Sequence, residues 1–351
     1  MVVGVTGLNA NDNPGPGIAV IRSLRDAFGQ DDLKIIGLGY EPLEPGIYLP
    51  GMVDKTYQVP FPTAGVAALE ERLKVIHDKE KLDLVIPNFD SELFNFIRIA
   101  PSLNAMGIKT FLPTHEQLDM RDKINLSDFG KKYGFSVPDD FKIYTNSDLK
   151  KASEKLGFPL VVKGKYYEAS VEYSLDLAEK AFHRLSAKWG LPVITQRFIK
   201  GIEINIAGLG DGMGNTISVV PMRKLYITDK GKAWAGVTIE DEKLIALAKK
   251  FVSETKWKGG FELEIMRDAD GELYIMEINP RFPAWVYLTA AAGQNQPAAL
   301  ARMAMGEEVK PFAGYEVGKL FIRYSWDQVA DIADFQQFSA FGELPLGSRM
   351  K

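Results

Sequence analysis

The chain has 351 residues, of which 46% are hydrophobic and 25% charged, a composition typical of a globular protein with two or three domains. The 42 Lys and Arg residues against 46 Asp and Glu give a formal net charge of −4, which argues against a protein that mainly coats nucleic acid or an anionic membrane. The absence of cysteine excludes disulfides, thiolate metal sites and thiol nucleophiles, and the three histidines lie far apart in the sequence.

The N-terminal segment, Met1 to Leu8, is apolar but has neither the basic residues nor the cleavage site of a signal peptide. It is interpreted as a first β-strand. No apolar run approaches the roughly 18–20 residues that a membrane helix requires. We therefore expect a cytoplasmic protein with no membrane partner and no nucleic-acid partner.

Strand-like and helix-like segments alternate over the first third of the chain. Four short apolar or β-branched runs predict strands at 2–8, 33–40, 82–86 and 108–112. A Pro-Gly turn at 13–17 precedes the first expected helix, and the apolar spacing over 65–80 predicts an amphipathic helix. This alternation predicts βαβ units and a Rossmann-like parallel sheet over residues 1–113.

The middle of the chain changes character. Residues 114–134 look helical, and Asn146 or Ser147 is expected to cap a helix that ends at Gly157. A second helix is expected from the cap Ser174 to Gly190. Strands are expected at 159–163, 193–199, 203–239 (with hairpin turns), 260–267 and 272–279, and a helix at 240–256. Residues 326–351 are too irregular to assign.

The segment 261–281 carries the most chemistry. Strand side chains alternate faces, so Glu262 and Glu264 share one face, and Glu277 and Asn279 share a face of the return strand. A hairpin closed at Asp270-Gly271 brings Glu264 close to Glu277. Oxygen ligands without histidine or sulfur suit Mg²⁺ or Mn²⁺, and Arg281 is placed to neutralise phosphate charge. The alternative is a solvated hairpin with acidic residues on its wet face.

The Glu-Ile-Asn-Pro-Arg sequence at 277–281 resembles the metal-binding strand of the ATP-grasp superfamily, and is most similar to the carbamoyl-phosphate-synthase-like branch. The resemblance covers about residues 1–325. It implies that Glu264, Glu277 and Asn279 bind Mg²⁺ ions that bridge ATP phosphates, and that Arg281 is a catalytic residue near the transferred phosphate. Glu262 is the alternative to Glu264 if the strand register differs.

Four further motifs follow in the order that this superfamily shows. They are Arg121-Asp122-Lys123, the segment 157–163 that ends in Lys163, Gln196-Arg197-Phe198-Ile199 and Gly201-Ile202-Glu203. The resemblance implies that Lys123 and Lys163 contact the nucleotide phosphates. It also implies that the adenine is read at Gln196, Phe198 and Ile199, with backbone groups of the last two favoured, and that Glu203 holds the ribose. The alternatives are a snorkelling surface lysine at 163 and an exposed strand glutamate at 203.

The segment after Lys163 departs from the family pattern. A glycine-rich loop usually closes over the phosphates, whereas residues 164–170 contain one glycine and two tyrosines. Either Lys165 acts there as a catalytic point charge, or the lid is shorter and differently ordered.

The resemblance implies an α/β protein in which a Rossmann-like domain precedes a two-lobed α+β ATP-grasp module. The expected limits are 1–113 for the first domain, 114–192 and 193–325 for the two lobes, and 326–351 for an unassigned tail. The implied activity is ATP-dependent ligation of a carboxylate to an amine through an acylphosphate, with an amino acid or peptide as the acid. The alternatives are a bicarbonate-dependent carboxylase or carbamoyl-forming enzyme, and a nucleotide-binding scaffold without catalysis.

The residues that bind the remaining substrates are less well defined. Ligands of open α/β sheets gather beyond the carboxyl ends of the strands. The candidates there are Asn9, Asn11, Asp12, Asp90 and Glu92, and the Gly15-Pro16-Gly17 turn is either an anion site at a helix start or a plain tight turn. One of three basic strand residues, Arg223, Lys224 and Arg323, is expected to bind a substrate carboxylate. Phe335, Phe338 and Phe341 are candidates for covering a homodimer interface.

Overall fold

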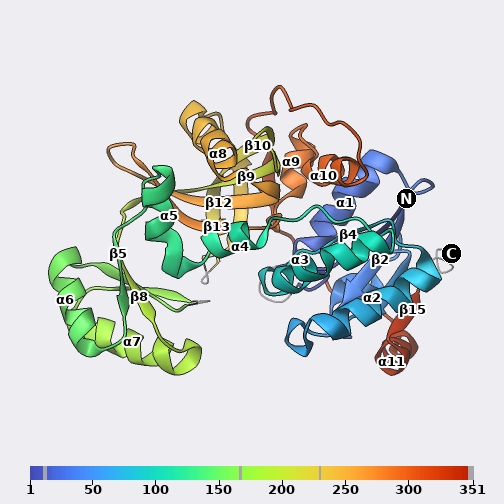
Figure 1. The fold of residues 1–351 in the computed structure, drawn as a ribbon, viewed down its shortest axis with the longest axis horizontal. Helices are drawn as coiled ribbons and strands as arrows, with labels where there is room; N and C mark the ends of the chain where they lie inside the picture. Colours follow the sequence, from blue (N-terminus) through green and yellow to red (C-terminus); the bar gives the residue numbers. More distant parts are fainter. Residues whose placement is uncertain (11–13, 166–167, 229–230, 347–351) are drawn as a thin grey trace. The chain divides into compact units, whose positions relative to one another are not determined.

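The computed structural model describes residues 1–10, 14–165, 168–228 and 231–346 (Figure 1). The chain forms two compact units. Unit one contains Met1–His115, Asn205–Glu262 and Asn279–Lys351, and unit two contains Glu116–Ile204 and Leu263–Ile278. The chain passes from one unit to the other several times, so the units are not consecutive segments. The domain limits expected after residues 113, 192 and 325 stay predictions.

Unit one contains a five-stranded sheet. Its strands are β1 (Val2–Val5), β2 (Lys34–Gly39), β3 (Lys55–Gln58), β4 (Leu84–Ile86) and β15 (Glu343–Pro345). The order is β15-β3-β2-β1-β4, with β15 antiparallel to β3 and the other neighbours parallel. The parallel arrangement confirms the Rossmann-like sheet that the alternation of strands and helices predicted.

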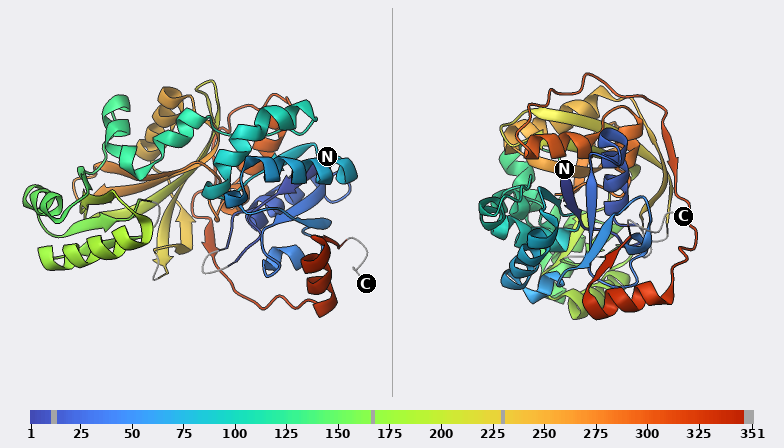
Figure 2. Two further views of the ribbon diagram at one scale, coloured as in Figure 1. Left: turned by 60° about the horizontal axis from the view of Figure 1, so that its bottom comes forward. Right: turned by 90° about the vertical axis from the view of Figure 1, so that its right-hand side faces the viewer.

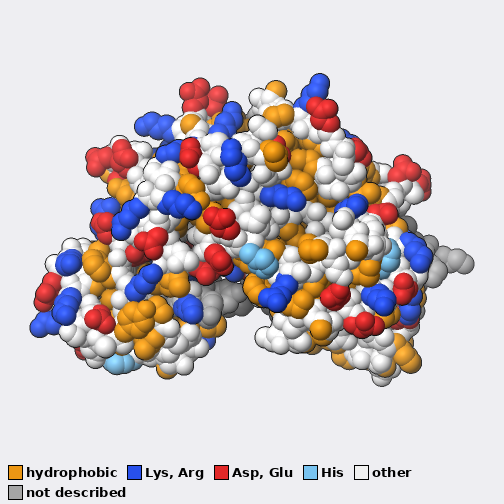
Figure 3. All heavy atoms as spheres, in the orientation of Figure 1, with side chains coloured by type: hydrophobic (Ala, Val, Ile, Leu, Met, Phe, Trp, Pro, Cys, Tyr) orange, Lys and Arg blue, Asp and Glu red, His pale blue; other side chains and the backbone are white. Residues whose placement is uncertain are grey.

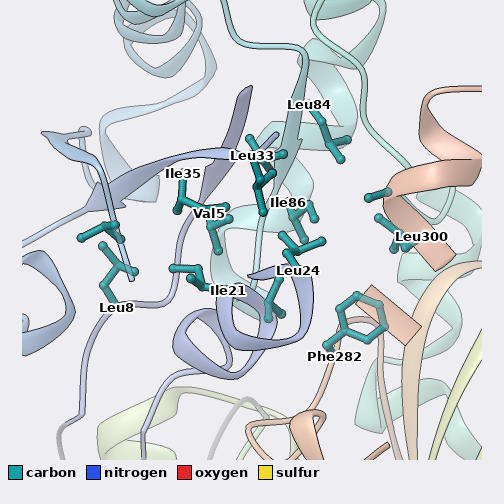
Figure 4. Packing of buried hydrophobic residues seen from close by; sticks show 14 of the residues in the cluster. Val5, Leu8, Ile21, Leu24, Leu33, Ile35, Leu84, Ile86, Phe282 and Leu300 are labelled. Atoms are coloured by element: carbon teal, nitrogen blue, oxygen red, sulfur yellow. The ribbon is translucent and has the colours of Figure 1, made fainter. Parts of the chain in front are cut away.

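Helices cover both faces of this sheet. On one face, α1 (Gly17–Phe28) packs against α10 (Gln296–Ala304), and side chains of α1 meet the strand residues Val5 and Ile35 in a closed apolar core (Figure 4). On the other face lie α2 (Val66–Glu80) and α3 (Asp90–Ala105). Short 3₁₀ turns occur at Pro45–Tyr48 and Pro62–Ala64.

The strand predicted at 108–112 is wrong. Among the described residues this segment forms a single bridge, between Leu84 and Lys109, with hydrogen bonds from Lys109 N to Asp83 O at 2.7 Å and from Val85 N to Lys109 O at 3.0 Å. Pro113 follows closely and lacks the N–H group that a longer ladder needs. Strand β3 and helix α3 lie in segments for which the sequence predicts no element.

The C-terminal segment 326–351, for which the sequence predicts no element, belongs to unit one. It forms α11 (Ile332–Phe341) and β15, whose Leu344 pairs with Thr56 of β3. The helix is drawn in red in Figure 2. Phe338 is fully buried in the core of the sheet, whereas the side chain of Phe341 is 75% exposed. Of the aromatic residues proposed for a subunit interface, Phe338 is therefore unavailable because it packs inside its own subunit.

Unit two contains a four-stranded antiparallel sheet with the order β5-β8-β6-β7. Its strands are β5 (Asp140–Ile143), β6 (Leu160–Lys163), β7 (Ala169–Glu172) and β8 (Val193–Arg197). The helices α6 (Asn146–Leu156) and α7 (Leu175–Trp189) cover one face, with Leu160, Val162 and Val193 beneath them. The region predicted as helical at 114–134 consists of α4 (His115–Met120), a 3₁₀ turn (Lys123–Asn125) and α5 (Leu126–Tyr133).

The cap of α6 is Thr145, so the predicted caps Asn146 and Ser147 are wrong. The Thr145 hydroxyl accepts from Asp148 N at 3.2 Å, and the Asp148 carboxylate accepts from Thr145 N at 3.0 Å. This reciprocal pair satisfies two amide groups that the helix itself leaves free, and Asn146 lies already inside the helix.

Thr145→Ala is expected to lower the free energy of unfolding by about 1 kcal/mol, because it removes one half of the capping pair. Urea unfolding followed by circular dichroism measures the change. Asn146→Ala is the matched control, since that exposed side chain caps nothing in the described residues. An equal loss of unfolding free energy in both variants would show that the assignment of Thr145 as the cap is wrong.

A six-stranded sheet has the order β13-β12-β9-β10-β11-β14. Its strands are β9 (Gly201–Asp211), β10 (Thr216–Ile227), β11 (Ala233–Thr238), β12 (Lys258–Asp268), β13 (Leu273–Asn279) and β14 (Leu320–Ile322), and α8 (Glu242–Thr255) and α9 (Tyr287–Ala291) complete the elements. The predicted hairpin strands and the α/β fold class are confirmed. Both signs of charge intermix on the face shown in Figure 3, in keeping with the small net charge. Among the described helices, none is both long and apolar enough to cross a membrane.

Candidate active site

The strand pairing of unit two places Lys163 on the face of the sheet that the helices leave uncovered. Directly paired residues of neighbouring strands share a face. Lys163 pairs with Ile194, and Val161 pairs with Gln196, so these side chains lie opposite the helix-covered Leu160 and Val162. Val161 and Ile194 are buried, which gives this face an apolar floor between a lysine and a buried carboxamide.

Lys163 lies among groups of both charges. Desolvation and the neighbouring Lys123 ammonium lower the pKa of Lys163 to about 8, although the Glu277, Glu264 and Asp140 carboxylates act in the opposite direction. Lys123 Nζ lies 3.6 Å from Glu277 Oε1. The structure thus brings together four of the residues that the motifs singled out, from three separate segments of unit two.

Asp140 is a member of this cluster that the sequence analysis missed. It pairs with Gln196 and so shares the uncovered face. Burial raises the pKa of Asp140 to about 6, while the nearby Lys142 and Lys163 lower it. An aspartate at the start of a strand, directly after Asp139, gives no specific sequence signal, and its register with Gln196 is known only from the structure.

The predicted lid contacts are only partly described. Tyr166 and Tyr167 lie outside the described residues. Burial raises the pKa of Asp122, and Arg121 and Lys165 lower it. Lys165 therefore faces a carboxylate next to Lys123, and its catalytic role stays a prediction.

Of the predicted adenine and ribose residues, Gln196 lies within β8, Phe198 and Ile199 follow that strand, and Glu203 lies near the start of β9. Gln196 is 2% exposed, and its side-chain Oε1 has no hydrogen-bond partner among the described residues. A buried acceptor without a donor is costly unless a ligand satisfies it. The side chain thus offers an acceptor that the sequence analysis had set aside in favour of backbone groups at Phe198 and Ile199. Glu203 is half-buried on β9, and its ribose contact stays a prediction.

The predicted metal ligands come from β12 and β13. Glu264 and Glu277 are half-buried, and both carboxylates act on the Lys163 ammonium. Within the described part of the chain, no group of three or more His, Cys, Asp or Glu side chains is placed to hold a metal ion. Two carboxylates with an amide oxygen nevertheless fit Mg²⁺, which takes few protein ligands and completes its shell with water and phosphate oxygens.

Glu262 is held in a buried network of unit one, which favours Glu264 over Glu262 as the predicted metal ligand. The residue is 5% exposed, and its Oε1 accepts from Asn205 Nδ2 and from Trp285 Nε1, each at 2.7 Å. Its Oε2 accepts from Asn279 Nδ2 at 3.1 Å. With both oxygens occupied by protein donors, Glu262 is poorly suited to a metal, and Glu264 is the better candidate.

The same network orients Asn279 and Arg281, two polar residues that come after Glu277 in the sequence. Because Asn279 donates its Nδ2 to Glu262, its amide oxygen is directed elsewhere, toward Arg281 Nη2 at 3.4 Å. Arg281 donates from Nε to Asp90 Oδ2 at 2.9 Å and has its Nη1 3.7 Å from Glu262 Oε2. Asp90 therefore enters the candidate site as a residue that holds Arg281 rather than as a substrate ligand.

Glu262→Gln is expected to lower the free energy of unfolding by at least about 1 kcal/mol, because its new amide would face the donors of Asn279 and Arg281. Urea unfolding measures this. Glu264→Gln is the comparison, since that half-buried carboxylate faces ammonium groups instead of buried amide donors. Wild-type stability of Glu262→Gln would contradict the assigned network.

The other N-terminal candidates have mainly structural surroundings. Glu92 is buried and accepts from Thr6 Oγ1 at 2.5 Å, from Phe89 N at 2.9 Å and from the Tyr40 hydroxyl. In the turn before α1, Gly17 N donates to Gly7 O at 3.0 Å, which favours a plain tight turn over an anion site. Asn9 lies just after β1, and Asn11 and Asp12 lie outside the described residues.

A family model matches residues 191–320; it is ATPgrasp_Ter, described as "ATP-grasp in the biosynthetic pathway with Ter operon". The carbamoyl phosphate synthase large chain of Clostridium perfringens (strain 13 / Type A) is 24% identical over 274 residues, which cover 71% of this chain and 24% of that protein. The same protein of Clostridium beijerinckii is 26% identical over 255 residues, 64% of this chain and 22% of that protein. The chain spans about a quarter of the length of these curated relatives.

Solved structures share the fold at low identity. A Campylobacter jejuni biotin carboxylase in complex with β,γ-ATP has a TM-score of 0.70 and 16% identity over 90% of this chain and 73% of that chain. The biotin carboxylase domain of Hydrogenobacter thermophilus 2-oxoglutarate carboxylase, a dimer with Mg-ADP and bicarbonate, has a TM-score of 0.67 and 19% identity over 90% of this chain and 73% of that chain. N5-carboxyaminoimidazole ribonucleotide synthetase of Thermus thermophilus has a TM-score of 0.66 and 18% identity over 90% of this chain and 81% of that chain. The family model, the curated relatives and the shared fold together confirm the resemblance to the ATP-grasp superfamily that the order of the motifs predicted.

Proposed function

We propose that this protein is an ATP-dependent ligase that joins a carboxylate to an amine and releases ADP and phosphate. The observation that carries the proposal is the cluster of Lys123, Lys163, Glu264 and Glu277 in unit two. Cations and carboxylates in alternation suit a polyphosphate with its metal, since the lysines balance phosphate charge and the carboxylates balance the metal. Phosphoryl transfer needs such positioning and charge neutralisation, and neither histidine nor cysteine.

The face of the unit two sheet opposite α6 and α7 is the proposed place of the nucleotide. The apolar Val161 and Ile194 offer a floor for a base, and the unpartnered Gln196 Oε1 accepts from an exocyclic amino group such as that of adenine. Lys163, at the end of β6, reaches the phosphates from the same face. Backbone groups at Phe198 and Ile199, and the carboxylate of Glu203, complete the proposed contacts to base and ribose.

Glu264, Glu277 and Asn279 are proposed to hold Mg²⁺, which when bound neutralises the negative charge that builds up on the phosphates. The amide nitrogen of Asn279 is committed to Glu262, so its oxygen, which accepts a long bond from Arg281 Nη2 at 3.4 Å, is the atom proposed to bind the metal. Arg281, held by Asp90, is proposed to neutralise the transferred phosphoryl group. Lys165 is proposed as an additional charge on the phosphates.

The proposed reaction has two steps. A carboxylate oxygen attacks the γ-phosphorus of ATP and ADP leaves, which gives an acylphosphate. The amine nitrogen then attacks the acyl carbon, phosphate leaves, and the amine loses a proton. An amino acid or a peptide is the proposed acid, and a small amine or a second amino acid is the proposed acceptor.

Carboxylation is the second candidate, because solved neighbours are named as biotin carboxylases and as an N5-carboxyaminoimidazole ribonucleotide synthetase. Here bicarbonate takes the place of the organic acid. The test is ADP release from Mg-ATP with a panel of amino acids and peptides, with and without bicarbonate, followed by mass spectrometry of the products. Acid-dependent turnover with a condensed product supports ligation, strict bicarbonate dependence supports carboxylation, and nucleotide binding without turnover supports an inactive scaffold.

A further inference from the structure

Arg323 is a half-buried arginine that follows the edge strand β14 in unit one. Its backbone N donates to Trp234 O at 2.8 Å, and its Nε donates to Ala233 O at 2.8 Å. Both bonds anchor it to the neighbouring strand β11, which pairs with β14 through Gly236 and Phe321. With the Nε side bound to the protein, the free end of the guanidinium presents Nη1 and Nη2 as a two-pronged donor.

This guanidinium lacks a counter-charge of its own. Within the described residues Arg323 forms no ion pair, and the carboxylate that acts on it is that of Glu262. Glu262 is already engaged, because three side chains donate to it and Arg281 Nη1 lies 3.7 Å from it. Desolvation lowers the pKa of Arg323 to about 10, so the group is charged at neutral pH but poorly solvated.

A half-buried, poorly compensated arginine is costly to the fold and suits an anionic ligand. The other two basic candidates of the sequence analysis lack this property. Arg223 is exposed to solvent, and Lys224 Nζ is directed to Gly231 O at 3.4 Å. Among the three, the structure therefore singles out Arg323.

We propose that Arg323 binds a substrate carboxylate that does not react, held end-on between Nη1 and Nη2. The paired donors match the two oxygens of a carboxylate. Glu262 lies 3.7 Å from Arg281 Nη1, and its charge also acts on Arg323, so both arginines belong to the surroundings of one carboxylate in unit one. This inference rests on the proposed ligase function and narrows its substrates: one of them carries a carboxylate in addition to its reacting group, as amino acids and dicarboxylic acids do.

The test uses equilibrium binding in the absence of nucleotide, so that it does not depend on catalysis. Succinate is the probe, and the dissociation constant is obtained from the rise in melting temperature with concentration. Succinamide, which has the same length without charge, and sodium sulfate at equal ionic strength are the comparisons. We expect a response to succinate that exceeds both, and an equal or absent response to succinate would overturn the proposal.

Three variants locate the binding. Arg323→Met is expected to weaken succinate binding at least about tenfold, and Arg323→Lys is expected to fall between it and the wild type because it keeps the charge but not the fork. Arg223→Met should bind succinate like the wild type. Loss of binding in Arg223→Met, or unchanged binding in Arg323→Met, would overturn the assignment.

Mg-ADP binding, measured on the same samples, separates the two proposals. Arg323→Met should keep the wild-type affinity for Mg-ADP, which also shows that the variant is folded; if it does not, Arg323→Lys takes its place in the comparison. Failure of the succinate response alone removes the carboxylate site and leaves the ligase proposal standing. Failure of nucleotide binding in the wild type removes the ligase proposal itself.

Discussion

Replacing Glu277 by Gln is expected to lower the rate of ADP release by about 100- to 1,000-fold, the range observed when one preorganised charge-stabilising group is removed from an active site. The carboxylate of Glu277 faces Lys123 at 3.6 Å and also acts on Lys163. Its amide replacement cannot balance a divalent cation. We expect kcat to fall more than the affinity for ADP measured without metal, because the lysines that meet the phosphates remain.

The measurement is a coupled ADP-release assay over a range of Mg²⁺ concentrations. Glu272→Gln is the matched control, because Glu272 lies exposed in the turn between β12 and β13. This substitution removes the same charge from the same hairpin. It should leave the rate within about twofold of the wild type. A wild-type rate in Glu277→Gln, or an equal loss in both variants, would contradict the assigned metal site.

The part of this site that the sequence predicts is the part encoded by local pattern. Alternation along a strand places Glu277 with Asn279 and pairs Glu262 with Glu264, because the side-chain period of a strand is fixed. Alternation does not say which neighbour covers which position. Glu262 and Glu264 are equivalent in the pattern, and they separate only because Trp285 and Asn205, distant in the sequence, occupy the Glu262 carboxylate.

Long-range strand pairing limits the prediction of the fold in the same way. The short strand β3 is bordered by a turn-rich segment, and β15 is a three-residue strand near the end of the chain, so neither has a local pattern of its own. Strand β3 pairs with β2 on one side, and β15 pairs with β3 on the other across almost the whole sequence, with Leu344 opposite Thr56. Conversely, the segment 108–112 has the composition of a strand but makes a single bridge among the described residues, and Pro113, which lacks an N–H group, prevents the pairing from extending past Leu112.

Lys163→Met is expected to weaken ATP binding by about 10- to 100-fold, the loss that corresponds to one hydrogen bond to a charged group. The same substitution is expected to raise the melting temperature of the nucleotide-free protein by roughly 2 °C or more, because the native surroundings of Lys163 disfavour its charge. Isothermal titration calorimetry and thermal unfolding measure the two effects. Lys151→Met, at an exposed position of α6, is the control and should change neither.

The weaker ATP binding and the higher melting temperature of Lys163→Met have the same cause, which is the loss of the buried Lys163 ammonium. That charge favours phosphate binding but disfavours the folded state. The pH dependence of the stability gain distinguishes this cause from better packing of the methionine. The pKa of Lys163 is about 8 in the folded chain and 10.5 for an ordinary lysine, so the unfolded chain binds the extra proton between these values. The stability gain of Lys163→Met should therefore be complete below pH 8 and should vanish as the pH approaches 10.5. ATP binding by the wild type should weaken as the pH rises through about 8, whereas binding by the variant should not. A stability gain that persists at pH 10.5 would mean that methionine merely packs better, and a pH-independent affinity in the wild type would mean that the Lys163 ammonium does not meet the phosphates.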